Sequence, residues 1–298
     1  MQLNGFELYG YDAPDPQKAA VNLFFAHANG IPALTYTELF EKIAHTLNVN
    51  IVSYDMRGIG KTTQKEPVDN VNWSWQVLID DQVLLFEEVK KKYSGSWILA
   101  GHSLGGWLAI LAAEKLNCLD VMVWDPPVLP LNILVKWVTA VVIGRRDLNY
   151  NSRKVKNRTK IYPSYDIAHE RLKNSSLMKK WSERTVRNYL EGSFAQKEDH
   201  IELRHNPFWE ALIFDDYLPL SCQGFLKLSR SFRKKLRLVF FVGEKSDTCN
   251  PKAKSWVKLF FPQVKWFLMN NGTHMFPMEQ SEDLLVALNL FLKERNFS

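Results

Sequence analysis

The sequence has few cysteines, and their spacing argues against two common uses of this residue. The 298 residues include three cysteines, Cys118, Cys222 and Cys249, which lie far apart without a Cys-x-x-Cys spacing. An odd number of widely separated cysteines disfavours a disulfide framework, and the absent spacing disfavours a cysteine-ligated metal. A reducing, cytoplasmic setting is therefore expected.

The sequence also lacks the segments that would insert it into a membrane. The N-terminal residues 1–6 show no basic region followed by an apolar one, so we expect no signal peptide. The most apolar stretch, residues 128–144, contains Pro130 and Lys136. It falls short of the roughly 20 apolar residues that a membrane-spanning helix needs. A soluble chain without stable membrane insertion is expected.

A strong excess of charge is missing too. The net charge is +6, with 46% apolar and 23% charged residues, as in ordinary soluble globular proteins. Basic residues gather between Arg145 and Lys160, but only Tyr150 and Tyr162 accompany them. This pattern does not favour a nucleic-acid partner. A solvated loop is the favoured interpretation, with attraction of an anionic substrate or lipid surface left open.

The glycines after Asp55 do not form a phosphate-binding loop. Only one residue separates Gly58 from Gly60, whereas the Walker pattern needs four before Gly-Lys-Ser/Thr. We interpret Asp55 and Arg57 as parts of a structural turn.

The most informative stretch runs from Ser96 to Trp107. A short apolar run ends at Gly101-His102-Ser103-Leu104-Gly105, and a helical pattern begins directly behind it. Strand, tight turn and helix in this order are typical of a nucleophile elbow, in which the serine has a positive φ. The glycines are needed because side chains there would clash with the closing strand and helix. The helix N-terminus offers the Leu104 N–H to an oxyanion.

Further apolar runs predict a parallel sheet. Strands are expected over 6–11, 21–26, 50–54, 120–124, 236–242 and 264–269, with helices over 37–47, 75–93, 104–116, 252–260 and 281–293. Buried strands alternating with helices indicate a parallel sheet covered on both faces. Sites in such sheets lie at the carboxyl ends of the strands, where Ser103 and Asn29 fall.

The alternation stops between residues 128 and 235. The periodic segments there look helical, so we predict an inserted helical cap over 128–235 and a discontinuous core over 1–127 and 236–298. The apolar run 128–144 would either wall the pocket or form a buried helix of the cap.

Taken together, the motifs resemble those of the α/β-hydrolase fold family, in particular its capped serine hydrolases and esterases. The resemblance covers essentially the whole chain and rests on His27–Gly30, Asp55–Gly60, Gly101–Gly105, Gly243–Asp247 and Gly272–Met275. It implies a mostly parallel central sheet, helices on both faces and an α-helical cap. The order Ser, Asp, His is the one that this family shows.

The resemblance also implies the role of each residue. Ser103 is the expected nucleophile, His274 the base and Asp247 the acid, with Asp125 as an alternative acid because it also ends a strand. Backbone N–H groups of Asn29 and Leu104 are the expected oxyanion donors. No metal and no organic cofactor are expected. His27 and His102 are interpreted as structural, and the cap residues His169, His200 and His205 as surface residues.

These residues predict an acyl-enzyme mechanism. Because the cap is rich in Trp, Phe and Leu, the expected partner is a small carboxylic ester or thioester with an apolar acyl part. Cleavage of a carbon–carbon bond and perhydrolysis use the same triad and stay open, as does a non-catalytic protein that binds a small ligand. Haloalkane dehalogenation and epoxide hydrolysis would require aspartate in place of Ser103. The oligomeric state is left open.

Overall fold

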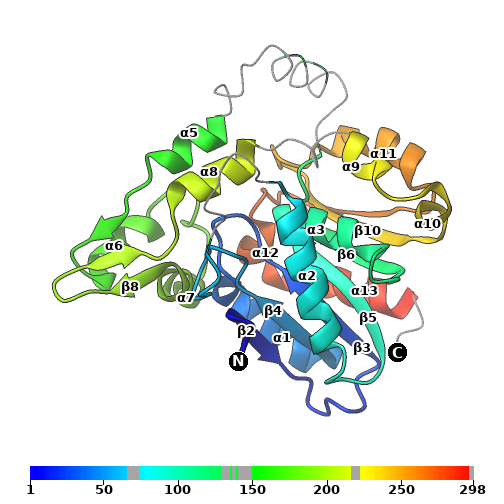
Figure 1. Cartoon of the computed structure of the whole chain (residues 1–298), viewed down its shortest axis with the longest axis horizontal. Coiled ribbons are helices and arrows are strands. Elements are labelled where there is room, and N and C mark those ends of the chain that lie inside the picture. The colour runs from blue at the N-terminus through cyan, green and yellow to red at the C-terminus, as the bar shows by residue number, and fades with distance from the viewer. Residues whose placement is uncertain (66–73, 129–134, 136–138, 140–149, 216–221, 295–298) are drawn as a thin grey trace.

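The structure is a computed structural model that describes residues 1–65, 74–128, 135, 139, 150–215 and 222–294 (Figure 1). Within them, eight strands form one sheet in the order β1-β2-β4-β3-β5-β6-β10-β11. β1 pairs antiparallel with β2, and β2 with β4, while the remaining neighbours are parallel. The strands are β1 (Gln2–Leu3), β2 (Phe6–Tyr11), β3 (Val21–Ala26), β4 (Val49–Tyr54), β5 (Ser96–His102), β6 (Asp120–Trp124), β10 (Arg237–Gly243) and β11 (Lys265–Met269).

Helices cover both faces of this sheet, because the central strands are apolar on both sides. All six residues of β3 are buried, with Phe24 in one apolar cluster and Leu23 and Phe25 in the other. The Phe24 cluster includes side chains of α2 (Gln76–Val89), α3 (Leu104–Ala113) and α11 (Lys254–Phe260). The opposite cluster includes those of α1 (Thr37–Leu47) and α13 (Ser281–Glu294). The predicted fold class is confirmed.

Short helices also lie in connections that bear on the site. Among the described residues, the 3-10 helix η1 (Ala33–Tyr36) leads into α1 and the 3-10 helix η4 (Pro251–Ala253) leads into α11, while α12 (Phe276–Glu279) follows His274.

Residues 150–215 fall within the predicted cap and lie beside the core, on the left of Figure 1. Its elements are α5 (Tyr150–Lys156), β7 (Ile161–Tyr162), α6 (Tyr165–Lys173), α7 (Glu183–Ser193), β8 (Phe194–Gln196), β9 (Ile201–Leu203) and α8 (Pro207–Asp215). Strands β7, β9 and β8 form a three-stranded antiparallel sheet. The cap is therefore mixed rather than purely helical. Its strands are two or three residues long and show no alternation that the sequence could reveal.

The last part of the predicted cap packs with the core instead. Helices α9 (Cys222–Leu226) and α10 (Arg230–Lys235) place Phe225 and Phe232 in the same apolar cluster as α3. The Phe225 ring lies 4.7 Å from that of Trp107. The cap boundary at Lys235 stays a prediction. The prediction for residues 128–144 falls mostly outside the described part of the chain.

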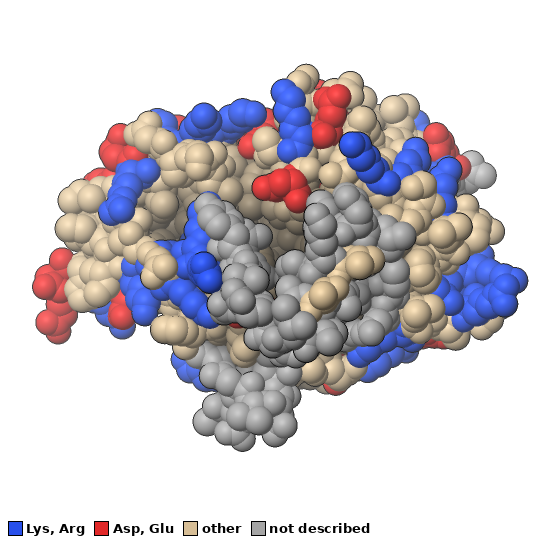
Figure 2. Space-filling view, turned by 90° about the horizontal axis from the view of Figure 1, so that it is seen from above, with Lys and Arg blue, Asp and Glu red and all other residues tan. Residues whose placement is uncertain are grey.

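The face seen in Figure 2 carries its charge in separate groups. Seen from above, Lys and Arg side chains form separate groups, with Asp and Glu between them (Figure 2). Among the helices that the structure describes, none is both long and apolar enough to cross a lipid bilayer.

Candidate active site

Ser103 sits in a strained turn between β5 and α3. Its φ of 55° and ψ of −117° lie in a region that residues with a side chain rarely adopt. A Cβ on Gly105 would lie 1.9 Å from the Ala26 oxygen, and one on Gly101 would lie 2.2 Å from the Gly105 carbonyl carbon. The predicted nucleophile elbow is confirmed in its geometry, and only glycines fit on either side of the serine.

His274 is held by a carboxylate that ends β6. Its Nδ1 lies 2.7 Å from Oδ2 of Asp125, a residue that is fully buried. An ionised carboxylate only accepts hydrogen bonds, so Nδ1 carries the proton and donates it. In neutral His274, Nε2 is then the unprotonated nitrogen, free to accept a proton from another group.

The expected acid, Asp247, does not reach His274, and this prediction is wrong. Asp247 is exposed, and its Oδ1 accepts a hydrogen bond from Thr248 Oγ1 at 3.2 Å. The turn after β10 directs Ser246 inward instead, and Ser246 Oγ donates to Asp125 Oδ2. The Gly243 N–H donates to Oδ1 of the same carboxylate at 2.8 Å. The loop after β10 thus donates hydrogen bonds to Asp125 and supplies no carboxylate to His274.

His102 connects the nucleophile turn to the His274 loop. Its Nε2 lies 2.9 Å from the backbone oxygen of His274, and the two imidazole rings are 4.9 Å apart. Ser103 and His274, both described, share no hydrogen bond in this structure. Such bonds are often long in a free enzyme and tighten with substrate. His102 is structural, as predicted.

The two expected oxyanion donors lie at strand ends of the same sheet. Leu104 is the first residue of α3, where helix geometry leaves the N–H without an internal partner. Asn29 follows β3 and is buried, and its side-chain Nδ2 donates to the Glu210 oxygen of α8 at 2.9 Å. Among the residues that the structure describes, no group accepts a hydrogen bond from either backbone N–H. Both stay candidate donors.

His27 braces the loop that carries Asn29. Its Nε2 accepts from the Met56 N–H at 2.9 Å, and its Nδ1 donates to the Ala28 oxygen at 2.7 Å. Burial lowers the pKa of His27 to about 4, so the ring stays neutral and keeps this pattern. The predicted structural role is confirmed.

Asp55 and Arg57 form a turn but do not pair with one another. Asp55 accepts hydrogen bonds from the Ala33 and Lys61 N–H groups, at 2.9 and 2.7 Å. Arg57 instead binds Asp81 of α2 through two nitrogens, at 2.6 and 2.8 Å. Both residues are structural, as interpreted from the sequence.

Part of the expected basic loop is built into the cap. Arg158 Nη1 lies 2.5 Å from Oε2 of Glu210, whose side chain is 5% exposed. His205 Nε2 bonds the same oxygen at 2.9 Å. Burial would raise the pKa of Glu210, but the Arg158 charge and His205 lower it. The expectation of surface residues is therefore wrong for His205, because an ion pair inside the cap needs it as a partner.

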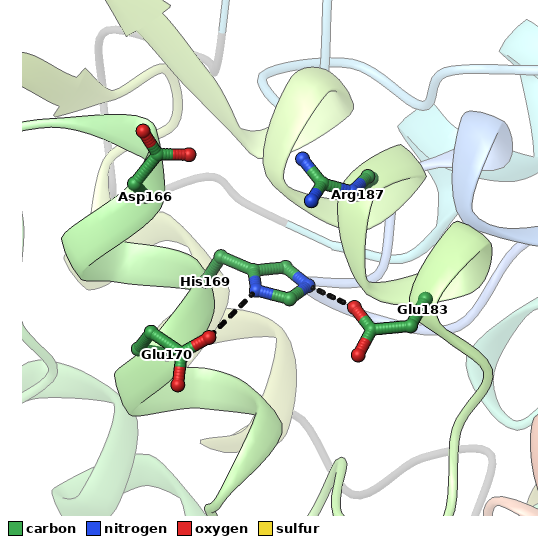
Figure 3. Close-up of a pocket in the computed structure, with 5 residues that line it drawn as sticks. All are labelled: Asp166, His169, Glu170, Glu183 and Arg187. Atoms are coloured by element: carbon green, nitrogen blue, oxygen red, sulfur yellow. Dashed lines mark ion pairs between the residues drawn. The ribbon is translucent and has the colours of Figure 1, made fainter.

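His169 is also buried, in a pocket of about 410 Å³ between α6 and α7. Figure 3 shows its ring between two carboxylates, with Nε2 2.8 Å from Glu183 and Nδ1 3.7 Å from Glu170. The contact with Glu183 ties α6 to α7, and burial shows that His169 is no surface residue either. His200 is partly exposed and pairs with Asp199 at 2.6 Å.

In the described part of the chain, no group of three or more His, Cys, Asp and Glu residues is arranged to hold a metal ion. Cys118 and Cys249 are buried free thiols. The side chain of Cys222 lies outside the described residues.

The comparisons with known proteins assign the family. Residues 23–288 match the alpha/beta hydrolase family, so the chain belongs to it, as its motifs predicted, and this membership makes it a hydrolase. No curated protein sequence matches the chain.

Solved structures share the fold at low sequence identity. The chain is similar to the peroxisomal alpha-beta-hydrolase Lpx1 of Saccharomyces cerevisiae, with 15% identity, a TM-score of 0.71 and coverage of 97% of this chain and 81% of that one. It is similar to a thioesterase domain from the curacin biosynthetic pathway, with 16% identity, a TM-score of 0.67 and 97% of both chains covered. A thermophilic esterase from Thermogutta terrifontis gives 15% identity, a TM-score of 0.61 and coverage of 97% and 93%.

Proposed function

We propose that this protein is a serine hydrolase that cleaves a carboxylic ester or thioester through Ser103, His274 and Asp125. The observation that carries the proposal is the bond of His274 Nδ1 to the buried Asp125 carboxylate, on the same sheet edge as the strained Ser103. Together these provide a nucleophile, a neutral base and an anion that holds the base.

The first half of the reaction forms an acyl-enzyme. His274 Nε2 takes the proton of Ser103 Oγ while Oγ attacks the substrate carbonyl carbon, and Asp125 stabilises the resulting imidazolium. The backbone N–H groups of Asn29 and Leu104 donate to the oxyanion, each worth about 3–4 kcal/mol of transition-state stabilisation. His274 then gives its proton to the departing alcohol or thiol, and the tetrahedral intermediate collapses.

The second half returns the free enzyme. His274 takes a proton from water, whose oxygen attacks the acyl carbon, and Ser103 leaves with that proton. The products are the carboxylic acid and the alcohol or thiol. No step requires a metal or an organic cofactor.

The proposed substrate has an apolar acyl part. The cap contributes aromatic side chains such as Trp209, which packs in the apolar cluster of α3, and Phe208, which is exposed. The solved structures similar to this chain include an esterase and a thioesterase domain, in keeping with either leaving group.

Hydrolysis of a nitrophenyl ester series from acetate to laurate tests the proposal. Wild type should hydrolyse at least one ester, and Ser103→Ala should lose all but the residual activity of the oxyanion donors. The matched control is Ser96→Ala, which removes an exposed hydroxyl from the start of β5 and should retain wild-type rates. Equal rates for Ser103→Ala and wild type would refute the proposal.

A further inference from the structure

The hydrogen bonds of His102 define its tautomer. Its Nε2 lies 2.9 Å from the His274 backbone oxygen, which can only accept, so Nε2 carries the proton. Complete burial and the nearby His274 and His27 rings lower the pKa of His102 well below its ordinary value. The ring is therefore neutral, and its Nδ1 is an acceptor.

Tyr36 supplies the donor that Nδ1 needs. Its hydroxyl lies 2.7 Å from His102 Nδ1, and since that nitrogen accepts, the hydroxyl donates. The same oxygen accepts a hydrogen bond from the Ala28 N–H at 3.2 Å. Burial raises the pKa of Tyr36, so the hydroxyl keeps its proton.

These bonds form one directed chain, from Ala28 N–H to Tyr36, from Tyr36 to His102, and from His102 to the His274 oxygen. Ala28 precedes Asn29, the candidate oxyanion donor. His102 precedes Ser103, and His274 is the proposed base. The chain therefore joins the three loops that carry the site.

We infer that Tyr36 and His102 are positioning residues, which together fix the oxyanion loop and the His274 loop relative to the nucleophile turn. This inference rests on the proposed function for its catalytic consequence. Neither side chain needs to touch substrate. Their effect is to hold two backbone segments in place, and a shift of about 1 Å in such groups can cost a factor of about 100 in rate.

Tyr36→Phe tests the inference, because it removes the hydroxyl and keeps the ring that stacks 5.6 Å from Phe40. We expect kcat for a nitrophenyl ester to fall about 10- to 100-fold with KM within about 2-fold. Tyr54→Phe is the matched control, since it removes an equally buried hydroxyl that has no hydrogen-bond partner among the described residues. Its kcat should match wild type. Equal kcat values for the two variants would overturn the inference.

Substitution of His102 separates positioning from packing. His102→Gln keeps an N–H that can donate to the His274 oxygen, whereas His102→Leu keeps only bulk. Glutamine should restore at least part of the kcat that leucine loses. Equal loss in the two variants would contradict a positioning role.

Nitrogen NMR of the wild-type protein reports on these hydrogen bonds without requiring catalytic turnover. In nitrogen NMR spectra, the His102 signals, assigned by their absence in His102→Gln, should show the Nε2–H tautomer and no protonation between pH 5 and 8. An Nδ1–H tautomer, or protonation in that range, would overturn the inference. A wild type that hydrolyses no ester would count against the proposed function and leave this NMR result standing.

Discussion

Two neighbouring strands, β6 and β10, each lead into an aspartate, and the structure treats the two residues in opposite ways. Asp125 follows β6 directly, is fully buried and bonds His274. Asp247 comes four residues after β10, is exposed and bonds Thr248. Both residues are aspartates, and both follow an apolar strand. The difference is made by the turn that follows each strand.

The turn after β6 buries the Asp125 carboxylate together with hydrogen-bond donors for both of its oxygens. Asp125 itself has a φ of 46°, which turns the chain sharply at the strand end. Gly243 N–H, Ser246 Oγ and His274 Nδ1 then all donate to its two oxygens. A buried carboxylate is tolerated only where donors replace the lost water, so the β10 loop and Asp125 depend on one another.

The largest expected effect comes from Asp125→Asn. An amide in place of the carboxylate favours the wrong tautomer of His274, so kcat should fall by a factor of about 10⁴. Steady-state ester hydrolysis measures the loss, and circular dichroism checks that the variant is folded. A loss of less than about 10-fold would move the acid elsewhere.

A third strand end, at Asp55 after β4, is buried like Asp125 but binds backbone N–H groups of a turn instead of a histidine. Burial raises the pKa of Asp55 from 3.8 to about 6, despite hydrogen bonds from Lys61, Ala33 and Tyr9. The native state therefore binds more protons than the unfolded state between these values, and stability falls as pH rises from about 4 to about 6.

The pKa shift of Asp55 corresponds to about 3 kcal/mol. At pH 7 the ionised carboxylate destabilises the native state by this amount relative to the unfolded state. In the Asp55→Asn variant, the amide at this position does not titrate. Urea unfolding from pH 4 to 7 should show wild type losing stability relative to Asp55→Asn across that window. A constant difference between the two would contradict this reading of the β4 end.

Ser246→Ala tests the support that the β10 loop gives to Asp125. Removing a hydrogen bond to a carboxylate costs roughly 1.5–3 kcal/mol, so kcat should fall about 10- to 100-fold. Thr248→Val is the matched control, because its hydroxyl contacts Asp247 and not Asp125. Equal rates in these two variants would show that Ser246 does not support Asp125.

The smallest effect is expected from Asp247→Asn. The side chain is exposed and far from any role in holding His274, so kcat should stay within about 2-fold of wild type. Stability should change by less than about 0.5 kcal/mol, as for most surface substitutions. A large loss of kcat with an intact fold would restore Asp247 as the acid.

Much of the core could be predicted because its signals are local. Apolar runs gave β3 and β6 with the bounds that the structure shows, and the glycines around Ser103 required the strained turn. The acid could not be assigned in this way, since Asp125 and Asp247 both follow apolar strands. Only the packing of the β10 turn against β6 decides which carboxylate meets His274.

The cap was less readable for a similar reason. Arg158 lies in a basic stretch that reads as solvated, yet Glu210, 52 residues later, pairs with it inside the cap. The residues next to Arg158 and Glu210 in the sequence do not indicate that the two side chains pair. Phe225 and Phe232 have an apolar character that suits either cap or core, and tertiary contacts place them with α3.

The rate of labelling at Ser103 distinguishes Asp125 from Asp247 as the partner that activates His274. Wild type, Asp125→Asn and Asp247→Asn are treated with a fluorophosphonate, and the modified residue is identified by peptide mass spectrometry. We predict that the label lies on Ser103, with Asp247→Asn reacting as fast as wild type and Asp125→Asn at least about 100-fold slower. A label on another residue, or slow labelling confined to Asp247→Asn, would contradict it.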